Sequence, residues 1–546
     1  VLMGFFFLLT LICWARFLEK NTRNRAAFYV GALACYALAL FSKTTACTLP
    51  AALVLILWLR RMPITLRRWL EIAPFVALAA AMAAVTIWWE RYHQGTQGAA
   101  FAVGFGERVL IANRALWFYL AKLIWPNELS FSYPHWSIST AHPLDYLWPV
   151  LTIAVAFAIW FLRRYTGRSV EVAMTFFVAT LLPVLGFVML WTFRYSWVAD
   201  HYQYLACIGP LTLFGAGIDR AASRFGPSRN LTLGAIAAVL LLSLGVRTWK
   251  QGAIYADAET LWRATIETNP RSALAHNSLG VILGTRNAPI EDELSEYRAA
   301  VESEPNDAEA HNNQGYALQR LGRTDEALRE YEKSVAADPR YAVAQGNLAT
   351  LLLQQGRSDE AVSHLEKVLA IDPQNAALEH SLGDILAAQG RANDSLAHWK
   401  RALELDPRDA ALQAKVGRTL AAAGQFDAAL PYLRAASELA PEDAQAHFNY
   451  AAALSLLSRF AEAIPENREA VRLQPNLAEA HLNLAIAYLQ TGQINEGVAE
   501  YERTAELKPN DAAIHTNLAA ILRHLGRNAE ADTHAERAAE LARQGF

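Results

Sequence analysis

Cysteine is scarce in this sequence. Only four of the 546 residues are cysteine, and Cys13, Cys35, Cys47 and Cys207 all lie in or beside apolar segments of the first 250 residues. None has the spacing of metal ligands, which favours small buried hydrophobic side chains over a metal site. The sequence after residue 250 also lacks a P-loop, a zinc-ligand spacing and a Ser-His-Asp order. These absences favour a binding module over a catalyst in the second part of the chain.

Acidic residues are scarce in the first part alone. Up to Lys250 the sequence has 22 Lys and Arg against 9 Asp and Glu, whereas the remainder has 27 against 43. The first part is apolar and basic, and the second is acidic and rich in Ala and Leu. This asymmetry predicts a membrane part joined to a soluble part. The acidic second part excludes a nucleic-acid partner.

Long apolar runs are confined to the first part. Roughly 20 residues cross the ~30 Å of membrane hydrocarbon, and arginines mark the cytoplasmic loops. The eight predicted spans lie near 1–18, 26–42, 45–60, 71–89, 146–163, 171–191, 203–218 and 230–247. The basic loops between them contain Arg16, Lys20, Arg23 and Arg25; Arg60, Arg61, Arg67 and Arg68; Arg163, Arg164 and Arg168; and Arg220, Arg224 and Arg229.

One apolar segment, near 108–126, does not fit a crossing. RVLIANRALWFYLAKLIWP carries Arg108, Asn113, Arg114 and Lys122 at helical spacings, and a crossing there would move every later basic loop outside. We therefore predict an interfacial or re-entrant helix on the outer face, with the C-terminal part extracytoplasmic. The sequence begins inside an apolar run without a signal-peptide pattern, and we expect it to be a fragment that lacks upstream spans.

Prolines recur at a fixed period in the second part. They stand at 270, 305, 339, 373, 407, 441, 475 and 509, so that the first interval is 35 residues and every later one is 34. Small residues such as Gly280 and Gly315 share this period, and they let two antiparallel helices approach closely before the proline ends the second one.

The unit AEAHNNQGYALQRLGRTDEALREYEKSVAADP (308–339) closely resembles the tetratricopeptide repeat. The resemblance implies eight repeats over 273–546, preceded by a linker and capping helix at 251–272 and a membrane domain at 1–250. The predicted fold class is all-α: a polytopic transmembrane helical bundle followed by a tetratricopeptide-repeat α-solenoid. Such a solenoid has a concave groove suited to an extended peptide.

Two polar registers recur in the first helix of the repeats. One contains Asn313, Asn347, Asn449, Asn483 and Asn517. In tetratricopeptide arrays this register faces the groove, where an amide can bind a peptide backbone; the alternative, a solvated face or a brace to the neighbouring repeat, is equally open. The other contains His276, His311, His447, His481 and His515. Because units stack roughly 10 Å apart and zinc ligands bind at about 2 Å, we predict packing residues there and no metal site.

Polar and aromatic residues are concentrated in FRYSWVADHYQYLACIGP (193–210), between two predicted spans. A carboxylate such as Asp200 is energetically costly at or below the membrane interface unless it is paired with a cation. Arg194 or His201 is the expected partner. LFSKTTACTLP (40–50) and LIWPNELSFSYPHWS (123–137) have the same character. A pocket with cations for a phosphate and aromatic faces for a sugar is one interpretation, and an interfacial salt bridge within an aromatic belt is the other.

The succession LFSKTTACTLPAALVLILW, FYLAKLIWPNELSFSYP and ADHYQYLACIGP, followed by the repeats, resembles the transmembrane and tetratricopeptide-repeat-containing family of GT-C-type, O-mannosyltransferase-like membrane glycosyltransferases. The resemblance spans essentially the whole chain and departs at His201, where many relatives have arginine. It implies an enzyme that transfers a sugar such as mannose from a polyprenyl-phosphate carrier to protein Ser or Thr outside the cytoplasm, with the repeats binding the acceptor. The family's catalytic carboxylates are expected in a first outer loop ahead of this sequence, so none is carried over.

The candidate site residues follow from both lines of reasoning. Asp200 and His201 are the catalytic candidates. The candidates for binding the lipid carrier or sugar are Lys43, Arg194, Tyr202, Tyr133 and His135. No cofactor is evident, and the resemblance leaves a divalent metal open for the complete enzyme.

Two other functions fit the same pattern. A non-enzymatic membrane-anchored scaffold would use the repeats to assemble envelope proteins, and a polysaccharide polymerase or ligase would also combine many spans with outer-loop cations. Eight spans exceed what an anchor needs, which favours chemistry or transport over the scaffold. The expected partners are the bilayer, a polyprenyl-phosphate sugar donor and an acceptor polypeptide or envelope protein. The expected location is the plasma (inner) membrane, as a multi-pass protein with extracytoplasmic repeats.

Overall fold

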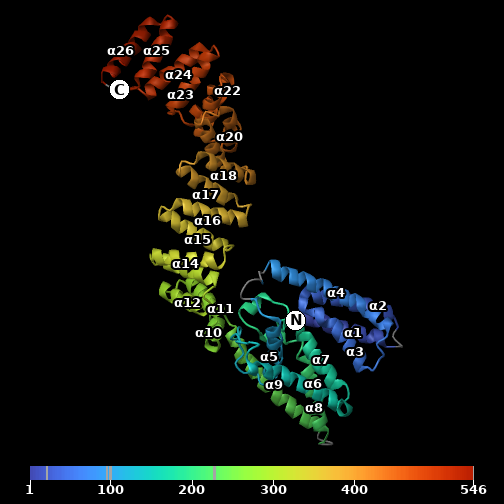
Figure 1. Cartoon of the computed structure of the whole chain (residues 1–546). Helices are drawn as coiled ribbons and strands as arrows, with labels where there is room; N and C mark the ends of the chain where they lie inside the picture. The colour runs from blue at the N-terminus through green and yellow to red at the C-terminus, as the bar shows by residue number, and fades with distance from the viewer. Residues whose placement is uncertain (20–22, 94–95, 97–100, 225–228, 545–546) are drawn as a thin grey trace. The chain divides into compact units, whose positions relative to one another are not determined.

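The computed structural model describes residues 1–19, 23–93, 96, 101–224 and 229–544. Their regular elements are helices, and the contacts between them divide the chain into two units, Val1–Ser334 and Val335–Phe546 (Figure 1). The sequence changes in composition near residue 250. The first unit therefore combines the apolar helices with the first helices of the repeat region.

The apolar part of the first unit is built from long helices joined by short turns. Its α-helices are α1 Leu2–Leu18, α2 Arg25–Ser42, α3 Leu49–Leu59, α4 Leu66–Tyr92, α5 Phe105–Ile124, α6 Leu147–Thr166, α7 Ser169–Leu181, α8 Ile208–Ala222 and α9 Arg229–Ile254.

Four of the described helices have the length and apolar composition to cross a membrane, which makes this a membrane protein by sequence and structure. They are Arg25–Ser42, Leu66–Tyr92, Pro143–Thr166 and Asn230–Ile254. The apolar helices Leu2–Leu18, Thr44–Leu59 and Ser169–Val184 are shorter. The eight crossings therefore stay a prediction.

Three of the four predicted cytoplasmic loops meet at one end of these helices, which we call the basic end. Arg60 donates a hydrogen bond to the Ala15 carbonyl at 3.1 Å, and Arg168 donates one to the Trp58 carbonyl at the same distance. These bonds join the ends of α1, α3 and α7. Lys20 and the side chain of Arg229, which belong to the same predicted loops, lie outside the described residues.

The other end, which we call the loop end, brings together segments 125–137 and 191–204. The Trp191 amide donates to the Glu90 carboxylate at 2.9 Å, which joins segment 191–204 to the end of α4. Arg247 of α9 donates to the Pro126 carbonyl, which joins segment 125–137 to the helix before the repeats.

Helix α5 has both of its ends at the loop end. Arg108 near its start donates to the Phe187 carbonyl at 3.1 Å, and Lys122 near its end donates to the Glu128 carbonyl at 3.2 Å. Arg114 in the middle lies 4.6 Å from the Trp136 ring of segment 125–137. These contacts fix α5 among its neighbours, and its interfacial position in the membrane stays a prediction.

Two apolar clusters hold the helices of this part together. Trp14, Tyr36 and Phe75 are fully buried among α1, α2 and α4, with ring centroids 5.9 Å apart for Trp14 and Phe75. Tyr119 and Phe177 belong to a second cluster that joins α5 to α7. Edge-to-face ring packing of this kind stabilises a fold by about 0.5–1.5 kcal/mol per pair beyond area burial.

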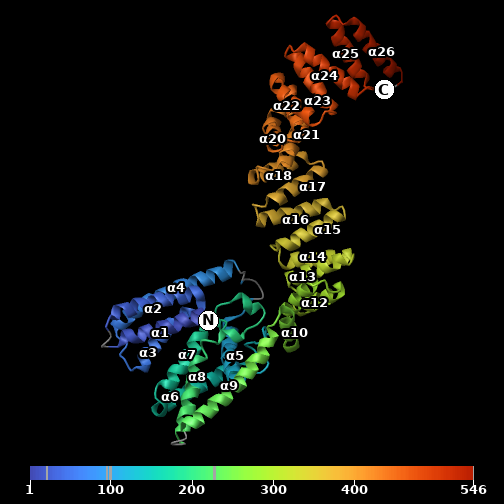
Figure 2. The same cartoon turned by 180° about the vertical axis from the view of Figure 1, so that it is seen from behind.

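The repeat region is a succession of helix pairs. In the first unit these are α10 Ala258–Thr268, which stands alone, then α11 Ala273–Thr285, α12 Ile290–Ser303, α13 Ala308–Arg320 and most of α14 Thr324–Ala337, whose last residues belong to the second unit. In the second unit the pairs are stacked in order (Figures 1 and 2). They are α15 Ala342–Gln354, α16 Ser358–Ile371, α17 Ala376–Ala388, α18 Ala392–Leu405, α19 Ala410–Ala422, α20 Phe426–Leu439, α21 Ala444–Leu456, α22 Phe460–Leu473, α23 Ala478–Gln490, α24 Ile494–Leu507, α25 Ala512–His524 and α26 Asn528–Gln544.

The recurring small residues lie where the two helices of a pair are closest. A Cβ atom on Gly315 would lie 2.8 Å from the ring of Tyr331, and one on Gly383 would lie 2.3 Å from the ring of Trp399. Larger side chains do not fit at these positions. The recurrence of small residues along the sequence thus follows directly from the close packing of the two helices in each pair.

Candidate functional site at the loop end

Segment 191–204 is a chain of short 3₁₀ turns and not a long helix. Trp191–Arg194 and Asp200–Tyr202 form such turns; Phe193 in the first turn is buried, as are Trp197 and Val198 between the two. Buried apolar side chains fix the backbone of the segment, so that the polar residues between them are presented in defined directions.

Asp200 faces α5 and Tyr133. The Tyr133 hydroxyl donates a hydrogen bond to Asp200 Oδ1 at 2.8 Å. Burial raises the pKa of the Asp200 carboxyl above its usual value, while the Tyr133 hydrogen bond and the charge of Lys122 act in the opposite direction. A half-buried carboxylate with a raised pKa is a stronger base than an exposed one.

Lys122 is the cation on this side of the site. Its ammonium lies 5.2 Å from the Tyr133 ring and 5.5 Å from the Phe118 ring, and it donates to the Asn127 carbonyl at 2.5 Å. Lys122 was not among the predicted site residues. The signal that could have identified it is its spacing from Tyr119, three residues away on the same face of α5.

Tyr119 supports the turn that carries Asp200. It is fully buried, and its hydroxyl accepts a hydrogen bond from the Ala199 amide at 3.2 Å. This bond fixes the backbone immediately before Asp200 and makes Tyr119 a positioning residue.

His201 and Lys43 lie on the other side of the same turn. The Lys43 ammonium is 5.6 Å from the Tyr204 ring. The pKa of the His201 imidazole is lowered, first by burial and then by the charge of Lys43. The two predicted candidates are therefore neighbours, and a nearby anion would be drawn to Lys43.

Tyr202 and His135 lie close by but contact other partners. The Tyr202 hydroxyl shares a 2.7 Å hydrogen bond with Thr192. The His135 ring stacks on Trp197 with centroids 4.8 Å apart and planes 13° apart. Neither bonds to Asp200.

Arg194 contacts the repeats and not Asp200. Its guanidinium lies 3.0 Å from a Glu304 oxygen and 3.5 Å from an Asp307 oxygen, at the turn between α12 and α13. The expected partners of Asp200, Arg194 and His201, are thus replaced by Tyr133 and Lys122. A residue proposed to bind the lipid carrier instead joins the loop end to the first repeats.

Segment 125–137 makes the same connection. Thr268 at the end of α10 donates to Ser130 at 2.7 Å, and Asn269 donates to the Ser132 carbonyl at 3.4 Å. The Phe131 and Trp262 rings pack edge to face with centroids 5.1 Å apart. Within the first unit, α10 and the turn between α12 and α13 therefore lie against the segments that carry Asp200 and Tyr133.

The asparagine register contains side chains with different surroundings. Asn313 donates to Asn277 of the preceding repeat at 2.9 Å, and Asn449 accepts from Gln445 in its own helix at 2.9 Å. Asn347 and Asn483 are half-buried, and Asn517 is exposed. The bond of Asn313 fits the bracing interpretation, as does the hydrogen bond between Asn517 and Tyr501 of the preceding repeat, and the peptide-binding role of the register stays a prediction.

Four of the five histidines of this register bond to a glutamate, which corrects their interpretation as packing alone, whereas the fifth, His515, lies 3.0 Å from His534 Nδ1. His311 Nδ1 lies 2.6 Å from a Glu330 oxygen, and its Nε2 lies 2.9 Å from the Pro305 carbonyl. A carbonyl oxygen can only accept a hydrogen bond, and the same is true of an ionised carboxylate. Both ring nitrogens of His311 therefore carry hydrogen, and its imidazole is cationic. The equivalent pairs are His276–Glu296, His447–Glu466 and His481–Glu500. The sequence carried the signal, since each glutamate follows its histidine by 19 or 20 residues.

No cluster of three or more His, Cys, Asp or Glu side chains that could hold a metal ion occurs among the described residues. The ionisable groups near the Asp200 carboxyl include the ammonium groups of Lys122 and Lys43 and the His201 imidazole. The arrangement can take up a proton and attract an anion.

Comparisons with known proteins match the repeats and limited parts of the chain. Models of the tetratricopeptide repeat match residues 306–374, 352–419, 415–478, 457–521 and 512–546. Human protein O-mannosyl-transferase TMTC1 is 24% identical over 190 residues, which cover 30% of this chain and 21% of the relative. Protein O-mannosyl-transferase Tmtc2 of Drosophila melanogaster is 32% identical over 105 residues, which cover 19% of this chain and 10% of the relative. The match thus spans about a fifth or less of the length of these relatives.

Among solved structures, two repeat proteins illustrate the match. MamA has 22% identity and a TM-score of 0.29, over 30% of this chain and 95% of that chain. YrrB, described as a TPR protein with an unusual peptide-binding site, has 21% identity and a TM-score of 0.30, over 33% of this chain and 92% of that chain.

Proposed function

We propose, from the premise that this chain is a tetratricopeptide-repeat membrane protein similar to the protein O-mannosyl-transferases, that it acts as a membrane glycosyltransferase. The reaction moves a hexose such as mannose from a polyprenyl-phosphate carrier to a Ser or Thr hydroxyl of a protein, on the extracytoplasmic side of the membrane. The repeats are a module for binding protein or peptide, and in this proposal they bind the acceptor.

The surroundings of Asp200 carry the proposal. Transfer to a hydroxyl requires a base for its proton, and Asp200 is a half-buried carboxylate whose pKa burial raises. Tyr133 and Lys122 orient and stabilise its ionised form. In this mechanism Asp200 takes the acceptor proton as the sugar–phosphate bond breaks.

The leaving phosphate needs positive charge, and the other side of the turn supplies it. Lys43 lies beside His201 there, with the Tyr204 ring beneath its ammonium. Cations placed where negative charge develops stabilise the transition state. Lys43 is therefore assigned to the carrier phosphate, and Arg194, which is paired with Glu304, is assigned to holding the repeats in place.

The acceptor polypeptide is assigned to the asparagine register of the second unit. A half-buried amide such as Asn483 can donate to and accept from an extended backbone. The contacts of α10 and of the turn between α12 and α13 with the loop end join the first repeats to the segments that carry the site, within the first unit.

A transfer assay with reconstituted protein tests the proposal. The donor is polyprenyl-phosphate mannose and the acceptor is a Ser/Thr-rich peptide. Asp200→Asn should lower kcat by about 10²–10⁴-fold, the usual contribution of a general base. Asn483→Ala should raise KM for the peptide by about fivefold through the loss of roughly 1 kcal/mol, with kcat unchanged.

Matched controls separate these effects from misfolding. Glu128→Gln removes an exposed carboxylate from the adjacent loop, and Asn476→Ala removes an exposed amide outside the asparagine register. Both should leave transfer unchanged. Undiminished transfer by Asp200→Asn would remove Asp200 from the site. If the wild-type protein transferred no sugar but its repeats still bound a partner protein, the scaffold function would be favoured instead.

A further inference from the structure

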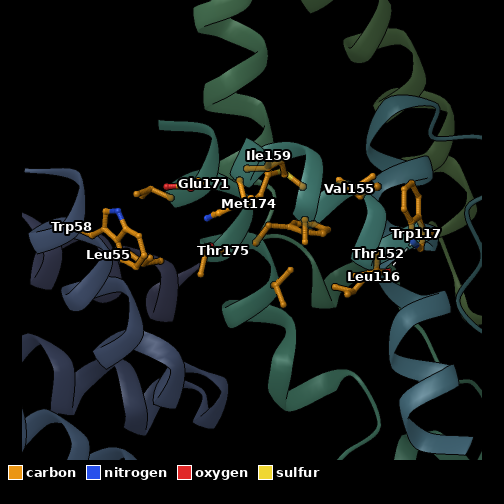
Figure 3. Close-up of a pocket in the computed structure, with 16 residues that line it drawn as sticks. Leu55, Trp58, Leu116, Trp117, Thr152, Val155, Ile159, Glu171, Met174 and Thr175 are labelled. Carbon is orange, nitrogen blue, oxygen red and sulfur yellow. Dashed lines mark hydrogen bonds between the residues drawn. The ribbon is translucent and has the colours of Figure 1, made fainter. Parts of the chain in front are cut away.

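An apolar crevice lies between four helices of the membrane part, apart from the Asp200 turn. Its volume is about 440 Å³, and residues of α3, α5, α6 and α7 line it. Figure 3 shows Leu55 and Trp58 on one side, Trp117, Thr152 and Val155 on the other, and Met174 between them. Sites that hold small molecules have volumes of about 300–1,000 Å³, so this crevice can accommodate a ligand.

The walls of the crevice suit a hydrocarbon chain. The side chains are mostly aliphatic or aromatic, and the Trp117 indole donates to Thr152 at 3.0 Å, so these two polar groups satisfy each other. The lining follows α6 from Thr152 to Trp160, which is about 12 Å at 1.5 Å per residue. None of the α6 residues is buried, so the helix faces the bilayer beside the crevice.

One end of the crevice is polar and coincides with the basic end of the helices. The Arg168 guanidinium lies 5.9 Å from the Trp58 ring, and the Arg163 guanidinium lies 5.6 Å from the Trp160 ring. Both tryptophans line the crevice. Tryptophan and arginine at a helix end are typical of the membrane interface, where a lipid phosphate lies.

Glu171 adds a polar group without a hydrogen-bond donor at this end of the crevice. It lines the crevice, and its Oε2 atom is buried without a hydrogen-bond partner. Its Oε1 atom lies 3.8 Å from Arg163, which is too long for a hydrogen bond. A buried carboxylate oxygen without a donor is costly, and because Glu171 lines the crevice, a donor on a ligand there would offset this cost.

We infer that this crevice binds one phospholipid with a primary-amine headgroup of the ethanolamine type. One acyl chain lies between α3, α5, α6 and α7, the phosphate lies beside Arg163 and Arg168, and the ammonium donates to Glu171 Oε2. The complementarity is specific: two cations meet the phosphate, and one unpaired carboxylate oxygen meets a group with N–H donors. A choline headgroup matches the phosphate only, because its quaternary nitrogen has no N–H. The inference is independent of the proposed transferase activity.

The test uses the full chain in vesicles of equimolar palmitoyl-oleoyl phosphatidylethanolamine and phosphatidylcholine. After mild detergent extraction, native mass spectrometry counts the lipids retained per protein. The wild type should retain one ethanolamine lipid in about tenfold or greater preference over the choline lipid, as expected for one charge-assisted hydrogen bond. Equal retention of the two lipids, or retention of neither, overturns the inference without any variant.

Two variants locate the binding. Glu171→Gln removes the charge and should bring the two headgroups to equal retention. Ala156→Phe fills the crevice and should abolish retention of both lipids, whereas Ala158→Phe places the same side chain at an exposed α6 position outside the lining and should leave the preference intact. Equal elution volume and helical circular dichroism identify folded variants. Retention by folded Ala156→Phe, or an unchanged preference in Glu171→Gln, contradicts the assignment.

Discussion

Opposing influences act on the carboxyl of Asp200. Burial favours its neutral form and raises its pKa, whereas the Tyr133 hydroxyl and the Lys122 charge favour the ionised form. The hydrogen bond is short, 2.8 Å, and joins segments that are 67 residues apart. Tyr133 is therefore the residue through which the basicity of Asp200 can be changed without removing the carboxylate.

Replacement of Tyr133 by phenylalanine should move the pH dependence of transfer. Loss of a hydrogen bond to the ionised form raises the pKa of Asp200 further, so the acidic limb of the kcat/KM profile should shift to higher pH. Tyr146→Phe, which removes a hydroxyl bonded to the Thr140 carbonyl, is the matched control and should leave the limb in place. A shift to lower pH in Tyr133→Phe would show that Asp200 is not the titrating base.

At the scale of the helix pair, the His–Glu pairs fix one helix against the next. In α13 and α14 the side chains of His311 and Glu330 are only 4% and 11% exposed. The same contact occurs with the residues exchanged, because Glu379 in α17 binds His398 in α18 at 2.6 Å. The position thus requires an acid and a base but not a fixed order.

This exchange predicts a double-variant result. His311→Glu or Glu330→His alone should each destabilise α13 and α14 by about 1–3 kcal/mol, because a buried charged group loses its partner. The exchanged pair, His311→Glu with Glu330→His, should recover most of this loss. Hydrogen exchange of α13 and α14 measures both, and failure of the double variant to recover would contradict the pairing.

The pair should also give a pH window. The pKa of His311 is raised from 6.5: burial alone would lower it, but the bonds to Glu330 and the Pro305 carbonyl outweigh burial. The pKa of Glu330 is lowered from 4.5 by His311 and Lys333 despite burial. The contribution of His311 to stability is complete below pH 6.5 and is lost as pH rises through its raised pKa. The contribution of Glu330 is complete above pH 4.5 and is lost as pH falls through its lowered pKa. The protection of α13 and α14 from hydrogen exchange that this pair provides should therefore be greatest between pH 4.5 and 6.5 and absent in the single variants.

At the scale of the first unit, Arg194 joins the membrane helices to the repeats. Its side chain and that of Glu304 are about a quarter exposed, and Asp307 is 6% exposed while also capping α13. Burial and the neighbouring carboxylates act on the guanidinium in opposite directions, and the carboxylates raise its pKa, so it stays charged. The contact is electrostatic and depends on both partners.

Reversal of one charge should loosen this contact and reversal of both should restore it. Arg194→Glu should increase hydrogen exchange in α10 to α13 by about tenfold or more, corresponding to roughly 1.4 kcal/mol. Adding Glu304→Arg should return exchange toward the wild-type rate. Unchanged exchange in Arg194→Glu would show that the ion pair does not hold the repeats in place.

Periodic features of this chain were predictable, and contacts between distant segments were not. The interval of 34 residues predicts every helix pair, and Gly315 and Gly383 lie where the predicted close approach occurs. The partners of Asp200 and Arg194 lie 67 and 110 residues away along the chain, in segments without any period. Only the folded backbone brings Tyr133 close to Asp200 and Glu304 close to Arg194. Sequence therefore identified Asp200 and Tyr133 as candidates but not as a pair.

The central claim is that the Asp200 site and the repeats are exposed on the extracytoplasmic side. Single cysteines in a chain whose four native cysteines are replaced by serine test it with a membrane-impermeant maleimide. The informative positions are exposed: Asn127→Cys at the loop end, Arg408→Cys in the repeats and Arg164→Cys at the basic end. In intact cells the reagent should label Asn127→Cys and Arg408→Cys, and it should label Arg164→Cys only after lysis. Labelling of Arg164→Cys in intact cells, with Arg408→Cys protected until lysis, would contradict the account.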